Sequence, residues 1–138
     1  ANNGNGISAE SGSSIVGNTV YGNKGERGIS ATGSTVKGNS VHDNADIGIF
    51  ARGCTLIGNT VSNNTGWGIQ ILDGSTVLTN TVGMNNKAGA PEKGGISVGD
   101  DCQIKGNTVS SNKQNNIHVS GSDNMIEENL LTDSLGGV

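Results

Sequence analysis

Four side chains in this sequence could together move a proton and neutralise a negative charge: Arg52, Asp73, Asp100 and His118. An arginine balances the charge of a carboxylate, and a histidine or a carboxylate can act as the base that removes a proton. The repeat described below places Arg52, Asp73 and Asp100 on successive coils, roughly 5 Å apart. These four residues are the candidate catalytic set, although so few acidic groups favour binding over catalysis.

A second group of side chains along the same strands could contact a sugar. Trp67, the only tryptophan, provides an aromatic surface at this edge. Phe50, Gln70 and Ser97 are expected to point outward from neighbouring strands, beside Arg52. We predict that these five residues form a shallow carbohydrate-binding strip.

Three aspartates, Asp73, Asp100 and Asp101, could hold a cation, because carboxylates are the usual ligands of Ca²⁺. Aspartates in turns, however, commonly cap the turn instead. Ca²⁺ is therefore left open as the one conceivable cofactor, and otherwise no cofactor is expected.

Two cysteines, Cys54 and Cys102, occupy equivalent positions of the repeat. Serines hold this position in other repeats, so the position favours a small side chain. The two cysteines belong to coils two steps apart, about 9.6 Å at sheet spacing, which is beyond the reach of a disulfide. We predict two unpaired, buried thiols and no disulfide.

A repeated pattern positions all of these residues, and it is clearest in residues 48–67, GIFARGCTLIGNTVSNNTGW. Each repeat opens with glycine, once asparagine, followed by isoleucine: Gly6, Gly28, Gly48, Gly68, Gly95 and Asn116. A first asparagine column follows: Asn18, Asn39, Asn59, Asn80, Asn107 and Asn129. A second column comprises Asn23, Asn44, Asn64, Asn85 and Asn112, with Ser134 in the last repeat. The repeats begin 20 to 27 residues apart, and repeats of this length indicate a solenoid.

Each repeat is expected to form one coil of three short strands with alternate side chains pointing inward. Ile49 and Ala51 should face the core, whereas Phe50 and Arg52 should face solvent. The asparagines fall in the bends, where they tolerate left-handed backbone angles and can bond from coil to coil as amide ladders. The glycines before the first column, Gly17, Gly38, Gly58 and Gly106, permit a tight corner. We predict an all-β fold, a parallel β-helix of about six coils that forms a single domain over residues 1–138.

The pattern G-I-x-V…G-N-T-V-x-x-N over residues 3–134 resembles the repeat of right-handed, pectin-lyase-like β-helices. Similar proteins include polysaccharide lyases, alginate epimerases, NosD-type accessory proteins, phage tailspikes and surface proteins, so the resemblance does not select one function. For a lyase or an epimerase it implies a site on the first-strand face, with Ca²⁺-binding carboxylates and an Arg, Lys or Tyr–His base. This chain lacks the acidic/His/Tyr cluster of an epimerase there, because Tyr21 is expected on another face.

The fourth repeat is interrupted by the segment GMNNKAGAPEKG, residues 83–94, which contains the only proline, Pro91. Insertions in solenoids form loops on one face, often the binding face. His42 and His118 should lie on different faces and cannot share a metal. The net charge of −4 argues against a nucleic-acid partner, and no apolar run is long enough to span a membrane.

These features favour a rigid structural or binding module of a larger secreted or cell-surface protein, with a carbohydrate or another protein as its partner. A polysaccharide lyase or a uronate C5-epimerase fragment is the alternative. Gly137 and Val138 resemble the opening of a seventh coil. We therefore expect either a fragment of a longer solenoid or a subunit that associates end to end, as in a filament.

Overall fold

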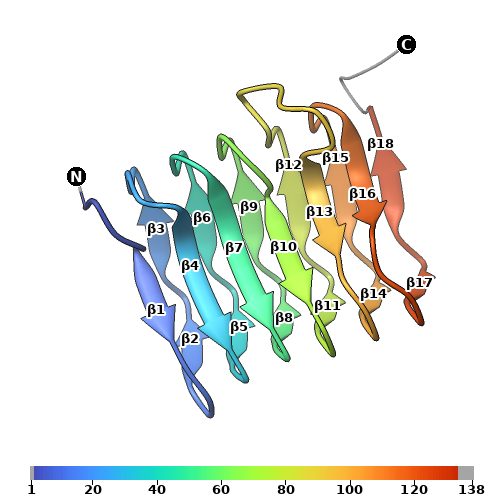
Figure 1. The fold of residues 1–138 in the computed structure, drawn as a ribbon, viewed down its shortest axis with the longest axis horizontal. Helices are drawn as coiled ribbons and strands as arrows, with labels where there is room; N and C mark the ends of the chain where they lie inside the picture. The colour runs from blue at the N-terminus through green and yellow to red at the C-terminus, as the bar shows by residue number, and fades with distance from the viewer. Residues whose placement is uncertain (1, 134–138) are drawn as a thin grey trace.

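The computed structural model describes residues 2–133, which fold into six coils of three strands each, and the strands of successive coils pair in parallel (Figure 1). The coils stack along the long axis of the molecule, so that equivalent strands of successive coils lie side by side. The first sheet contains β1 (Ile7–Ala9), β4 (Arg27–Thr32), β7 (Ile47–Arg52), β10 (Ile69–Leu72), β13 (Gly94–Val98) and β16 (Asn115–Val119). The second contains β2 (Ser14–Val16), β5 (Thr35–Lys37), β8 (Thr55–Ile57), β11 (Thr76–Leu78), β14 (Gln103–Lys105) and β17 (Met125–Glu127). The third contains β3 (Thr19–Tyr21), β6 (Ser40–His42), β9 (Thr60–Ser62), β12 (Thr81–Gly83), β15 (Thr108–Ser110) and β18 (Leu130–Thr132).

The core is a narrow column of aliphatic side chains that repeats from coil to coil. Ile49 and Ala51 are fully buried, as predicted, whereas the alternate residues Phe50 and Arg52 face outward. Each of the three sheets contributes one or two such columns, mostly of β-branched residues, which pack well on a pleated surface. The predicted all-β β-helix with three strands per coil is confirmed.

The turn after a strand of the first, second or third sheet is called the first, second or third turn of its coil. The two asparagine columns form hydrogen-bonded ladders along the inside of the second and third turns. Asn59 is typical: its main-chain N–H donates to Asn80 Oδ1 at 2.8 Å, and its Nδ2 donates to the same oxygen at 2.9 Å. Its Nδ2 also donates to the carbonyl of Val36, at 2.9 Å, on the coil before. The predicted ladders are therefore confirmed, and they satisfy main-chain groups that the turns would otherwise bury unpaired.

The left-handed backbone angle does not lie on the ladder asparagines, which were expected to tolerate it, and in the first column it lies on the glycine expected at the tight corner. It lies one position earlier, as at Gly58 (φ 60°) before Asn59, and at Asn63 (φ 57°) before Asn64. The same relation holds in the first turn, where Gly53 (φ 57°) precedes Cys54. A left-handed residue bends the chain at the corner, and the next side chain, such as that of Asn59, is buried inside the solenoid.

The glycine that opens each repeat has a steric cause. A Cβ on Gly48 would lie 2.6 Å from both Asn64 Nδ2 and Val61 Cγ1, so only glycine leaves room for the second ladder. In the sixth coil Asn116 replaces this glycine. Its Oδ1 accepts from Asn112 Nδ2 at 3.1 Å, and so it continues the ladder by another route. Ser134 and the predicted opening of a seventh coil lie outside the described residues.

The cysteine column is a third ladder, in the first turn. The main-chain N–H of Ser34 donates to Cys54 Sγ at 3.4 Å, and that of Cys54 donates to Ser75 Oγ at 3.2 Å. The N–H of Cys102 donates to Asn124 Oδ1 at 2.9 Å. Both cysteines are free and buried, and burial raises the pKa of the Cys102 thiol. This position requires an acceptor as well as a small side chain.

Candidate functional site

Arg52, Asp73 and Asp100 lie at the carboxyl ends of first-sheet strands, on three successive coils, as expected. Arg52 pairs in register with Leu72, directly before Asp73. Asp73 lies opposite Asp100, since the next residue, Gly74, donates its N–H to the Asp100 carbonyl at 3.1 Å. All three side chains are exposed, and Arg52 forms no ion pair with any other described residue.

The Asp100 carboxylate is already engaged within the fold. Its Oδ1 accepts from the main-chain N–H of Ser122 at 2.6 Å and from the Ser122 hydroxyl at 3.2 Å, which fixes the next turn. Within residues 2–133 no group of three or more His, Cys, Asp or Glu side chains is close enough to hold a metal ion. The three aspartates Asp73, Asp100 and Asp101 are thus not gathered into a cation site.

Trp67 of the predicted strip packs against His118, with ring centroids 5.9 Å apart and planes tilted by 35°. Trp67 is only 7% exposed, so its indole is not an open platform for a sugar. Gln70, Ser97 and His118 form one register column across β10, β13 and β16, and Ser97 is buried in its middle.

Phe50, the other aromatic ring of the strip, is also occupied. The Arg27 guanidinium carbon lies 3.9 Å from its ring centroid, a cation–π arrangement. Arg27 Nη1 donates to Ser30 Oγ at 3.2 Å, which fixes the guanidinium over the ring. Both aromatic side chains of the predicted strip therefore already contact partners within the chain.

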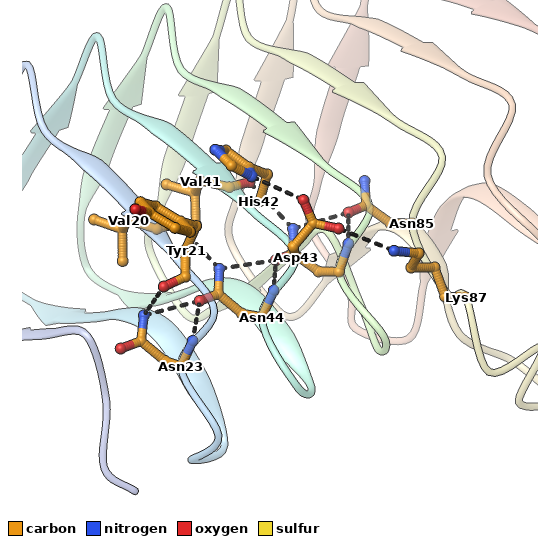
Figure 2. Close-up of polar contacts among 10 residues, drawn as sticks. Val20, Tyr21, Asn23, Val41, His42, Asp43, Asn44, Asn85 and Lys87 are labelled. Carbon is orange, nitrogen blue, oxygen red and sulfur yellow. Dashed lines mark hydrogen bonds and ion pairs between the residues drawn. The ribbon is translucent and has the colours of Figure 1, made fainter. Parts of the chain in front are cut away.

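A more closely connected set of polar side chains lies on the outer surface, where the strands of the third sheet end and the third turns begin. We call this set the turn-face cluster; its members are Tyr21, His42, Asp43 and Lys87 (Figure 2). The Tyr21 and His42 rings, on adjacent strands β3 and β6, stack with centroids 5.3 Å apart and an interplanar angle of 6°. His42 Nδ1 lies 2.9 Å from Asp43 Oδ2. Lys87 Nζ lies 2.9 Å from Asp43 Oδ1.

Tyr21 does lie away from the first sheet, as predicted, but the sequence interpretation missed that it joins a histidine and an acid there. The available signal was the equivalent position of Tyr21 and His42 in neighbouring repeats, with Asp43 next in sequence. The contact of Lys87 with Asp43 spans 44 residues.

Asp43 is the link of the cluster. It adopts φ 53°, the left-handed position before the buried Asn44, and its carboxylate points outward. The hydrogen bond from His42, followed by that from Lys87, holds the pKa of the Asp43 carboxyl below its usual value. The carboxylate therefore stays ionised and keeps both partners in place. Because it is ionised, it must accept the bond, so His42 Nδ1 carries the proton.

The insertion in the fourth coil is an ordered loop organised around Asn86, which is fully buried. Asn86 Nδ2 donates to the carbonyls of Ala90, at 2.9 Å, and Lys93, at 3.2 Å, and Asn86 Oδ1 accepts from the Ala90 N–H at 2.9 Å. Lys93 Nζ lies 3.0 Å from Asp46 Oδ1. Lys87 and Lys93 of the loop therefore form ion pairs with Asp43 and Asp46, which lie in the turn between the second and third coils.

Beside this loop the surface is hollowed. The hollow measures about 290 Å³ and is lined by Met84, Asn85, Lys87, Ser111 and Lys113. Lys87 and Lys113 both line the hollow, and Lys113 Nζ donates to the Lys87 carbonyl at 3.0 Å. Two lysines, a serine hydroxyl and the apolar Met84 side chain suit a carboxylate-bearing sugar, whose ring offers apolar C–H faces.

A family model described as the right handed beta helix region matches residues 1–131. The chain belongs to the right-handed β-helix family. Among solved structures, this β-helix is similar to the A-module of the mannuronan C-5 epimerase AlgE6 from Azotobacter vinelandii, with a TM-score of 0.53 and 14% sequence identity. The match covers 95% of this chain and 52% of the other, so the chain spans about half the length of that structure. A search of curated proteins finds no significant match.

In this β-helix the turn-face cluster does not form a serine-hydrolase triad. Ser62 lies opposite His42 in register, yet no hydrogen bond joins these two described residues. What the geometry does provide is an oriented imidazole, a phenol, and lysines beside a hollow. No helix of residues 2–133 is long and apolar enough to cross a membrane.

Proposed function

We propose that this β-helix is a rigid module of a larger secreted or cell-surface protein, and that its turn face binds an acidic polysaccharide. The observation that carries the proposal is the hollow bordered by Lys87 and Lys113 at the one interruption of the repeat. Both lysines are exposed, so a ligand can reach them. The similarity to a module of an enzyme named for mannuronan, a polymer of sugar acids, supports the same ligand class.

The fold suits this role because little must be ordered on binding. The ladder beneath the turn face holds Asn85, which also lines the hollow, through donations to Val61 and Gly83 carbonyls at 3.0 Å each. Asn86 holds the loop that presents Lys87. A site that is already in its bound geometry loses less conformational entropy when the ligand binds.

Binding of polymannuronate to the purified domain, measured by calorimetry, tests the proposal. Lys87→Met and Lys113→Met should each weaken binding about tenfold or more, because a hydrogen bond to a charged group contributes about 1.5–3 kcal/mol. Lys37→Met is the matched control, since Lys37 is an exposed lysine of β5 on another sheet. Binding that is unchanged in both turn-face variants, or lost only in Arg52→Ala and Trp67→Phe, would move the site to the first-sheet strip.

A catalytic role as a lyase or a C5-epimerase is the second candidate, and the Asp43-oriented imidazole of His42 beside Tyr21 favours it. Incubation with polymannuronate and pectin, followed by ultraviolet absorbance for unsaturated product and by NMR for inverted sugars, tests this role. Loss of product in His42→Gln would locate the chemistry at the turn face, and loss in Arg52→Ala or Asp100→Ala would locate it on the first sheet. Loss on chelation would indicate Ca²⁺. No product under any condition leaves the binding role.

A further inference from the structure

The two histidines of the sequence lie in different surroundings. His42 contacts Asp43, which in turn contacts Lys87 at the edge of the hollow. His118 packs against Trp67 on the first sheet. We infer that protonation of His42 strengthens binding of an acidic polysaccharide at the turn face, which makes this face a pH-sensitive binding site. The inference rests on the proposed function.

The geometry determines where the proton is gained. His42 Nδ1 already donates to the Asp43 carboxylate, so the second proton must arrive at Nε2. None of the described residues forms a hydrogen bond with Nε2, and the side chain is 32% exposed, so water can reach it. The Tyr21 ring stacked on His42 offers its negative face to the resulting cation.

Protonation changes the charge that the hollow presents. With a neutral imidazole, the Asp43 and Lys87 charges cancel each other, and Lys113 alone remains unopposed. The nearby pair of Lys93 and Asp46 is also neutral as a whole. With an imidazolium, Asp43 is balanced by His42, and the Lys87 charge becomes available to a ligand. Sugar carboxylates stay ionised down to about pH 4, so the added attraction operates in mildly acidic solution.

The test compares the dissociation constant for polymannuronate at about pH 5.5 and about pH 7.5, at one ionic strength, in three proteins. The wild type should bind about three- to tenfold more tightly at the lower pH, as one added charge near the ligand implies. His118→Gln, the matched control, should keep this ratio. His42→Gln should show equal affinity at the two pH values. A ratio that persists in His42→Gln, or a wild type with no ratio, would overturn the inference.

Asp43→Asn gives a second readout that a structural role for His42 would not produce. Removal of the carboxylate frees Lys87, so this variant should bind more tightly than the wild type at about pH 7.5 and approach its affinity at the lower pH. Asparagine accepts the left-handed angle of this position, so the turn should be retained. Weaker binding by Asp43→Asn at neutral pH would contradict the inference. Absence of binding by the wild type at both pH values would instead refute the proposed function.

Discussion

The inside and the outside of the third turn of the second coil differ in every respect that matters for function. Inside, Asn44 is 1% exposed, and its Nδ2 donates to Asn64 Oδ1 at 3.0 Å and to the Val20 carbonyl at 3.2 Å. Outside, one residue earlier, Asp43 is half-exposed and bonds to His42 and Lys87. Figure 2 shows both sides of this turn. The inner residue is repeated in almost every coil, whereas the outer position changes from coil to coil.

The reason is that an inner residue serves its neighbours on both sides. Loss of one ladder amide leaves donors and acceptors unpaired on two other coils, in a place water does not reach. The outer side chains do not satisfy buried main-chain groups of neighbouring coils. Tyr21, His42, Ser62, Gly83 and Ser110 follow one another in a single register column. Variation there costs little, so a binding surface can be built there without loss of the fold.

The largest expected effect comes from a comparison of two adjacent residues, Asn64 inside and Asn63 outside. Asn64→Ala removes the acceptor for Asn44 and the donor to the Val41 carbonyl, so we expect a loss of about 3 kcal/mol or more in unfolding free energy. Asn63→Gly should change it by less than about 0.5 kcal/mol, because Asn63 is in the left-handed region, which glycine adopts freely. Chemical denaturation measures both. Equal losses would refute the division between inside and outside.

The steric fit of the ladder gives the next largest effect. Gly48→Ala places a Cβ 2.6 Å from Asn64 Nδ2, Val61 Cγ1 and the Gly68 carbonyl, so atoms must shift around a packed site. Overpacking of this kind costs about 1–3 kcal/mol. Gly4→Ala is the control, because its backbone is not left-handed and its Cβ would meet only Asn2 Oδ1, at an ordinary 3.6 Å. A melting temperature for Gly48→Ala equal to or above that of Gly4→Ala would contradict this explanation of the repeated glycine.

A smaller, stabilising effect is expected at Thr79, which precedes Asn80 in the fourth coil. Thr79 is a β-branched residue at φ 52°, where the corresponding residues of the first three coils, Gly17, Gly38 and Gly58, are glycine. A left-handed non-glycine residue costs roughly 1–2 kcal/mol. Thr79→Gly should therefore raise the unfolding free energy by about 1 kcal/mol, as judged by denaturant midpoint. A lower midpoint would show that the Thr79 side chain contributes contacts that outweigh its strain.

The smallest effect concerns the ion pairs of the outer side. Because the pKa of Asp43 is lowered in the folded protein, its contribution to stability is present above the ordinary aspartate range, near pH 4, and is lost as pH falls through the lowered value. The pairs are half-exposed, so the contribution should be less than about 1 kcal/mol. The stability difference between wild type and Asp43→Asn should vanish in acid. A difference that does not depend on pH would mean that the Asp43 charge has no part in it.

The sequence predicted the architecture well because a repeat contains the same information six times. The inward isoleucines, the ladders and the strands all follow from residues that recur at fixed spacing. The tight corner at the glycines before the first ladder was also predictable, and Gly58 has φ 60°. Before the second ladder the left-handed residue varies in type, as at Asp43 and Asn63, so the pattern did not locate it.

The site was harder to predict, because its contacts are not periodic. Burial of Trp67 and the contact between Arg27 and Phe50 depend on how large side chains fold over neighbouring coils. The contact between Asp43 and Lys87 requires a loop that reaches back from the fourth coil toward the second. A pattern read along one strand does not contain such contacts.

The most direct test of the account is an NMR titration of the isotope-labelled domain with an oligomer of mannuronate. If the ladders stabilise the fold while the turn face binds the ligand, the largest chemical-shift changes should fall on Met84, Lys87, Ser111 and Lys113. We expect smaller changes at His42 and none at the ladder amides of Asn59 and Asn80. Shift changes centred on Arg52, Gln70 and Asp100, with the turn face unaffected, would contradict this expectation.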